Sequence, residues 1–108
     1  MLTRDSFKPY ALLKRERLDI PEMSDFVYVR ELSAGEALEF RRRMSAGEPF
    51  ESLVLPMLAK VIVDDKGVQV FDPSDTDLIG KAFPIEVMER IANKAQELSG
   101  LLGKSEKN

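Results

Sequence analysis

The stretch PFESLVLPMLAKVIV, residues 49–63, decides the fold predicted for this chain. Its apolar residues recur at positions i, i+3, i+4, i+7, i+8, i+11 and i+12, a spacing that aligns seven side chains along one face of an α-helix. The seven are Phe50, Leu53, Val54, Met57, Leu58, Val61 and Ile62. Most other positions are apolar too, and the strip left for water carries Glu51, Ser52 and Lys60. We therefore expect a helix that other elements cover on several sides.

Pro56 lies in the middle of this pattern. A proline inside a helix removes one backbone hydrogen bond and clashes with the preceding turn, at a cost of about 3 kcal/mol. Seven buried side chains at roughly 1.5 to 3 kcal/mol each outweigh that cost. We expect a kinked helix or two short collinear helices. A ligand groove would also need convergent polar groups, which this stretch lacks, so ordinary core is the favoured interpretation.

The composition indicates one folded domain. The chain has 108 residues, of which 44% are hydrophobic and 32% charged, and a chain of this length buries roughly two-thirds of its unfolded surface without metals or disulfides. We expect a single domain over residues 1–102 and a flexible tail over residues 103–108. The net charge of −3 gives no electrostatic reason to expect nucleic acid or an anionic membrane as a partner.

Two residue types that dominate enzyme and metal chemistry, cysteine and histidine, are missing from the sequence. Disulfides, the usual zinc ligands and the common nucleophile and base pairs are therefore excluded. Asp72, Asp75 and Asp77 lack the spacing of a calcium loop. We expect no catalytic residues, no cofactor and no metal. Since no apolar run follows Arg4 and Asp5, we also expect neither a signal peptide nor a membrane anchor, and an intracellular location.

Two extended runs near the start of the chain predict a β-hairpin. Residues 26–32, FVYVREL, are rich in aromatic and β-branched side chains. Residues 11–20 alternate in polarity and end before Pro21, which suggests an exposed strand, although residues 12–16 could equally open a helix. The turn is expected at residues 21–25.

Ser33 and Glu36 have the spacing of a capping box and should start a helix. Ala46 to Pro49, with a glycine and then a proline, should end it. This second helix precedes the central one and carries apolar residues on both of its sides.

The second half of the chain predicts a turn, a short extended segment and two helices. The turn is expected at residues 64–67 and the extended segment at residues 68–71. Asp72 should cap a short helix that Gly80 ends, and Pro84 should open the last helix. The predicted fold class is α+β, mainly helical, with an N-terminal β-hairpin packed on a small bundle of about four helices.

Three consecutive arginines, Arg41, Arg42 and Arg43, invite a nucleic-acid interpretation. On a helix they point about 100° apart and form no single patch, and they lie near a helix end where cations offset the dipole. A solvated helix end is therefore the favoured interpretation in this acidic chain. A small nucleic-acid-binding regulator or antitoxin remains the alternative function.

Several pieces of the sequence, in order and spacing, resemble the tail assembly chaperones of long, flexible-tailed bacteriophages (siphoviruses). The pieces are YVRELSAGE at 28–36 with Phe40, an apolar helix leading into VDDKG at 63–67, VF at 70–71, a capped acidic segment, and a helix ending in LSGL at 98–101. Together they span roughly residues 10 to 102. Pro56 and Pro84 are not matched to the pattern of that family.

The resemblance implies a non-catalytic function. Such chaperones coat the long, hydrophobic, largely helical tape measure protein, keep it soluble and help to recruit tail tube subunits. They act in the cytoplasm of the bacterial host and are absent from the mature virion. A long helix with exposed apolar stripes aggregates unless smaller proteins cover it, and weak contacts repeated along it provide avidity.

The resemblance also implies a second product. Members of this class commonly make a longer form by programmed ribosomal frameshifting near the end of the shorter reading frame, and the extension is thought to contact the tail tube protein. Gly103-Lys104 is a dipeptide that a slippery sequence could encode, which makes these two residues the candidate frameshift site.

The surface that would bind the partner is predicted from apolar residues in surplus to one small core. These residues are Leu38, Phe40, Met44, Leu55, Met57 and Met88. Methionine suits varied partner surfaces because its side chain is flexible. For each of the six, a place in the core is the alternative interpretation. The same surplus is the basis for expecting homo-oligomers.

Overall fold

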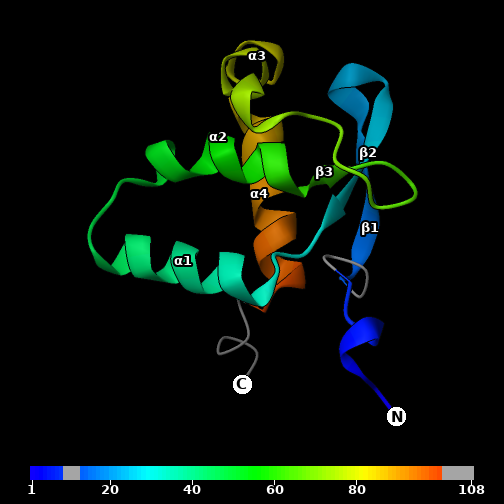
Figure 1. The fold of residues 1–108 in the computed structure, drawn as a ribbon. Helices are drawn as coiled ribbons and strands as arrows, with labels where there is room; N and C mark the ends of the chain where they lie inside the picture. The colour runs from blue at the N-terminus through cyan, green and yellow to red at the C-terminus, as the bar shows by residue number, and fades with distance from the viewer. Residues whose placement is uncertain (9–12, 101–108) are drawn as a thin grey trace, which may run out of the picture.

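The computed structural model describes residues 1–8 and 13–100, so the predicted tail at 103–108 lies outside the described residues (Figure 1). In chain order the elements are a 3₁₀ turn η1 (Arg4–Ser6), strand β1 (Arg15–Ile20), a 3₁₀ turn η2 (Pro21–Met23), strand β2 (Asp25–Arg30), helices α1 (Ala34–Ser45) and α2 (Phe50–Val61), strand β3 (Ile62–Val63), a 3₁₀ turn η3 (Pro73–Asp75), and helices α3 (Thr76–Ala82) and α4 (Ile85–Leu98). The predicted α+β, mainly helical class is confirmed.

The predicted central helix is α2, and it continues through Pro56. The residues of the predicted stripe are buried apart from Phe50, which is half-buried. Glu51, Ser52 and Lys60 form the exposed strip, as expected. Helix α4, helix α3 and strand β3 all contact α2, so the cover on several sides that its apolar circumference requires is present.

The expectation that this helix extends to Val63 is wrong for its last two residues. Ile62 has an extended backbone, with φ −81° and ψ 118°, and Ile62 and Val63 pair antiparallel with Val29 and Tyr28 of β2. Two β-branched residues in succession fit a strand well. The helical spacing continues through Ile62, so periodicity alone cannot detect this end.

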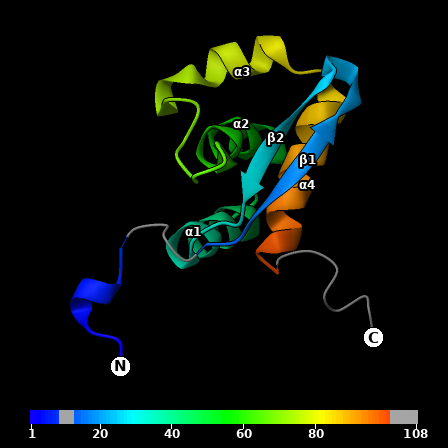
Figure 2. The ribbon, with the colours of Figure 1, turned by 90° about the vertical axis from the view of Figure 1, so that its right-hand side faces the viewer.

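The predicted hairpin is confirmed as β1 and β2, paired antiparallel with Leu18 opposite Val27 and Glu16 opposite Val29. Its tip is η2 followed by Ser24, which has a left-handed backbone, φ 55°. The face with Leu18 and Val27 packs on α4, and Figure 2 shows the hairpin lying across that helix. The hairpin therefore has the cover that two isolated strands would lack.

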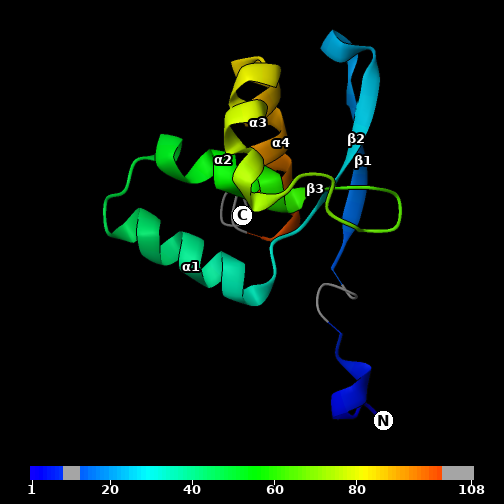
Figure 3. The ribbon, with the colours of Figure 1, turned by 45° about the horizontal axis from the view of Figure 1, so that its top comes forward.

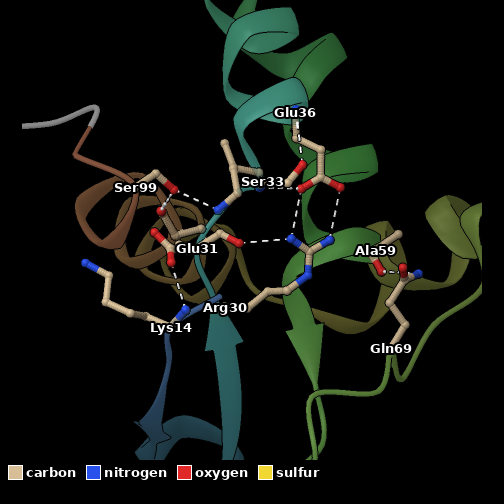
Figure 4. Close-up of polar contacts among 10 residues, drawn as sticks. Lys14, Arg30, Glu31, Ser33, Glu36, Ala59, Gln69 and Ser99 are labelled. Carbon is tan, nitrogen blue, oxygen red and sulfur yellow. Dashed lines mark hydrogen bonds and ion pairs between the residues drawn. The ribbon is translucent and has the colours of Figure 1, made fainter. Parts of the chain in front are cut away.

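The capping box predicted for α1 is present and is part of a larger polar cluster (Figure 4). The Glu36 amide donates to Ser33 Oγ at 3.3 Å, and the Ser33 amide donates to Glu36 Oε1 at 2.9 Å. Arg30, at the end of β2, donates to both carboxylate oxygens of Glu36 at 2.8 and 3.0 Å. This bidentate pair fixes the start of α1 against the end of β2.

The Arg30–Glu36 pair is nearly covered, with side-chain exposures of 4% and 14%. Burial by itself would raise the pKa of Glu36, but the hydrogen bonds from Arg30 and the Ser33 amide lower it overall. Glu36 is therefore ionised at neutral pH. The pair stabilises the charged forms of both Arg30 and Glu36. Loss of either partner would leave a buried charged group without its counterion.

The helix predicted to stop at Gly80 runs on to Ala82, so Gly80 lies inside α3. A Cβ at Gly80 would be 3.4 Å from Leu55 Cδ1 of α2, which is a van der Waals contact, so Gly80 faces α2. Helix α3 ends at Phe83, whose extended backbone is what a residue preceding proline prefers. Pro84 then opens α4, as predicted.

One apolar core joins the elements. Its most enclosed side chains include Val29 of β2, Leu58 of α2, Ile79 of α3 and Ile91 of α4. Helix α1 runs beside α2 at the edge of this core (Figures 1 and 3), and none of its residues is fully buried. The surface of α1, unlike that of α2, is therefore largely available to solvent.

Replacing Arg30 with methionine should lower the free energy of unfolding by roughly 3 kcal/mol or more, because Glu36 would remain ionised and buried without its partner. Urea denaturation at pH 7 measures this loss. The matched double variant R30M/E36Q removes the charge as well and should recover part of the stability. A loss below about 1 kcal/mol for R30M would contradict a stabilising role for the pair.

Candidate protein-binding surfaces

The first concave surface lies between α2, α3 and α4, and we call it the helical groove. It has a volume of about 540 Å³. Its apolar lining consists of Phe50, Val54, Leu55, Phe83, Ile85 and Met88, with Gly80 at its edge. Ile85 is 65% exposed. A groove whose walls are helices and whose lining is almost entirely apolar suits the apolar stripe of another helix.

The helical groove has two acidic residues in its lining. Glu51 of α2 and Glu89 of α4 are its two charged lining residues, and both are exposed. No basic side chain lines the groove among the described residues. The charge at its rim therefore favours a partner whose apolar stripe is flanked by lysine or arginine.

The second concave surface lies beside the tip of the hairpin, and we call it the hairpin groove. It has a volume of about 500 Å³. Its apolar lining includes Met23, Phe26, Tyr28, Val70, Phe71 and Phe83. Phe26 and Tyr28 contact edge to face with ring centroids 5.8 Å apart, and Phe71 and Phe83 do so at 6.4 Å. The surface is rich in the rigid aromatic side chains common at protein interfaces.

Three aspartates, Asp25, Asp64 and Asp65, line the hairpin groove with these apolar residues. The pKa of Asp64 is lowered because its carboxylate accepts the amide hydrogens of Val68 and Lys66, so this side chain is negatively charged at neutral pH. Beside the groove, Arg15 donates to the backbone oxygen of Asp65 at 2.8 Å. The groove itself is therefore acidic, with a cation held at its border.

A second arginine lies over the aromatic part of the hairpin groove. The guanidinium carbon of Arg17 is 3.9 Å from the centroid of the Phe26 ring, which is a cation–π distance. The same guanidinium donates to Asp19 at 2.9 Å. Its charge is therefore partly compensated by a neighbour on its own strand.

The six residues predicted to bind a partner are spread over three places. Leu55 and Met88 both line the helical groove, so the structure brings these two together although 33 positions separate them in the sequence. Leu38 and Met44 are exposed on α1, at 62% and 42%. Phe40 and Met57 border a small recess of about 50 Å³ between α1 and α2.

Met57 has the environment of a core residue. It is 4% exposed and belongs to the apolar cluster that holds the elements together. We therefore correct the expectation for Met57: its place in the described fold is the core, because it lies on the buried stripe of α2. Three further apolar residues of the helical groove were not predicted from the sequence, namely Phe50, Phe83 and Ile85. Ile85 follows Pro84 and lies off the buried stripe of α4, which is a signal that the sequence does contain.

Two of the three consecutive arginines are engaged in ion pairs. Arg42 Nη2 is 2.6 Å from a carboxylate oxygen of Glu39, and Arg43 Nη2 is 2.7 Å from one of Glu48. The hydrogen bonds with these carboxylates raise the pKa of both arginines. The positive charge of this run is thus largely compensated locally, which reduces what it offers to a nucleic acid.

The described residues contain neither a recognisable metal site nor a helix that could span a membrane. No group of three or more acidic, histidine or cysteine side chains within residues 1–8 and 13–100 has the arrangement of a metal site. Among the helices of that part of the chain, none is both long enough and apolar enough to span a membrane. The candidate frameshift residues Gly103 and Lys104 lie outside the described residues.

Comparisons with known proteins were made at three levels. No protein-family model, no curated protein and no solved structure matches this chain.

The hairpin tip beside its groove is attached to α4 by a pair whose pH dependence can be tested. Arg90 donates to both carboxylate oxygens of Glu22 at 2.9 and 2.6 Å, and these hydrogen bonds are the main cause that lowers the pKa of Glu22 from 4.5 to about 2. A lowered carboxylate pKa stabilises the fold above the ordinary value and loses that effect as the pH falls toward the folded value.

We expect the melting temperature of the wild type to exceed that of E22Q at pH 7, with the difference shrinking between about pH 4.5 and pH 2. Thermal denaturation followed by circular dichroism across this pH range measures it. The matched control is E51Q, at an exposed glutamate outside the pair. A difference between wild type and E22Q that is the same at pH 7 and pH 2 would contradict the assignment.

Proposed function

We propose that this chain is a non-catalytic phage tail assembly chaperone that binds and solubilises a tape measure protein and helps to recruit tail tube subunits. It would act in the cytoplasm of the bacterial host and be absent from the mature virion. The observation that carries the proposal is the helical groove, because its apolar lining between three helices suits the apolar face of another helix.

The chemistry of the helical groove supports a helical partner rather than a small molecule. Its lining offers apolar side chains, and its charged groups are two exposed carboxylates, Glu51 and Glu89, at the rim. A small-molecule site needs polar groups that converge inside the cavity to fix orientation. An amphipathic helix needs only apolar contact along a stripe, with charged residues of opposite sign beside it.

The exposed part of the lining supports a contact that is weak at each site. Ile85 is 65% exposed, and covering one such side chain contributes roughly 1.5 to 3 kcal/mol. A groove of this size therefore binds modestly. Many copies on one tape would give high total occupancy through avidity while each copy can still be displaced as the tube grows.

Recruitment of tube subunits is the second part of the proposed function, and the resemblance assigns it to a longer product made by frameshifting at Gly103-Lys104. Mass spectrometry of this protein from cells that express its native gene should then detect two products with the same first 102 residues. Mutation of the codons for Gly103 and Lys104 to synonymous, non-slippery ones should remove the longer product alone. Two products that persist after this change would contradict the frameshift.

Co-expression with the tape measure protein tests the main proposal. The tape should be mostly insoluble alone and mostly soluble with this chain. Replacing Ile85 with serine removes an exposed contact from the helical groove and should weaken tape binding roughly tenfold. The soluble fraction of the tape and the affinity of purified chain for a soluble tape segment are the two measurements.

The matched control is L78S, because Leu78 is also an exposed apolar residue, at 53%, but lies outside the helical groove on α3. L78S should bind as the wild type does. A tape that is equally soluble without this chain would refute the proposal. Equal losses in I85S and L78S would keep tape binding but refute the helical groove as its site.

A further inference from the structure

The first eight residues, which we call the arm, present apolar side chains to solvent. Every residue from Met1 to Lys8 is exposed, and Leu2 and Phe7 are exposed to 65% and 61%. The arm still has local order, since the Ser6 amide donates to the Thr3 carbonyl at 2.9 Å. It is therefore a locally ordered segment with three apolar side chains, Met1, Leu2 and Phe7, that lack cover within the described chain.

The hairpin groove is the complementary surface. Three of its apolar side chains, Met23, Phe26 and Val70, are exposed to 44%, 39% and 56%. Its aromatic lining suits an aromatic ring such as that of Phe7, because edge-to-face contacts add to the burial of apolar area. The arm has exposed apolar side chains and the hairpin groove has an exposed apolar lining, so contact between the two would cover both.

The charges of the two surfaces also match. The arm carries Arg4 and Lys8 against one acid, Asp5, so its side chains are net positive. Three aspartates and no basic residue line the hairpin groove among the described residues. Arg15 and Arg17 at its border are held by the Asp65 carbonyl and by Asp19. The attraction between arm and groove is therefore modest but has the right sign.

The positions of the two surfaces favour a contact between copies. The ribbon of the arm lies beyond the end of the hairpin where β1 begins, away from the tip (Figures 1 and 3), whereas the lining of the hairpin groove starts at Met23 in the tip and extends to Asp65. We infer that the arm of one copy binds the hairpin groove of a second copy. This contact is head to tail, so each copy has one arm and one groove to offer, and copies can join into rings or open chains.

The inference is independent of the proposed chaperone function, because it needs no tape and because the two grooves have only Phe83 in common among their lining residues. Its test is sedimentation velocity of the full-length chain and of two variants over a range of concentrations. The arm variant is L2S/F7S, and the groove variant is V70K, which replaces an exposed side chain and repels the basic arm. The matched control is L78K, outside both surfaces.

We expect the wild type and L78K to associate as concentration rises. The dissociation constants of L2S/F7S and V70K should each increase roughly tenfold or more. Circular dichroism of every variant verifies that the fold is retained. A variant that fails to fold is replaced by F7S for the arm or M23S for the groove.

The decisive experiment mixes the two variants. The arm variant retains an intact groove, and the groove variant retains an intact arm. An equimolar mixture should therefore form a heterodimer. It should not associate further, because the remaining arm and the remaining groove are both mutated. A mixture that stays monomeric would overturn the inference. So would association unaffected by either variant, or a wild-type chain that is monomeric at all concentrations, as expected if the arm binds its own groove.

Discussion

The constraint on which this structure depends is the apolar circumference of α2. A helix with one polar strip can be stable in water only if neighbours cover its remaining sides. Helix α4, helix α3 and strand β3 provide that cover. The order of the later elements follows from it. After α2 the chain enters the sheet as β3, and it then packs α3 and α4 against α2. The most apolar helix, α2, thus determines where its neighbours pack.

The features that sequence reasoning predicted correctly are set by local chemistry. Ser33 and Glu36 form their capping box because each satisfies a free amide of the other. Pro84 opens α4 because a proline suits the start of a helix. Strand β2 follows from its aromatic and β-branched residues, and β1 follows from alternating polarity that ends before Pro21. Each of these signals lies within a few residues of its effect.

The features that were missed depend on contacts between distant residues. Val63 belongs to a strand because Tyr28 lies across from it, and nothing near Val63 reveals that partner. Gly80 was predicted to end a helix because glycine often does so, but it lies inside α3, where an added Cβ would be in van der Waals contact with Leu55 of α2. Of the candidate site, Leu55 and Met88 were predicted from their apolar surplus, whereas the groove that joins them exists only after α2 and α4 have packed.

Phe83 belongs to the lining of both grooves. Its ring contacts Phe71 on one side and stands beside the α2–α4 surface on the other. A ligand that turns this ring from within one groove changes the shape of the other. The two binding equilibria would then share a coupling free energy, and by thermodynamic reciprocity each ligand would alter the affinity of the other by the same factor. Through this shared aromatic side chain, occupancy of one groove would be felt in the neighbouring one.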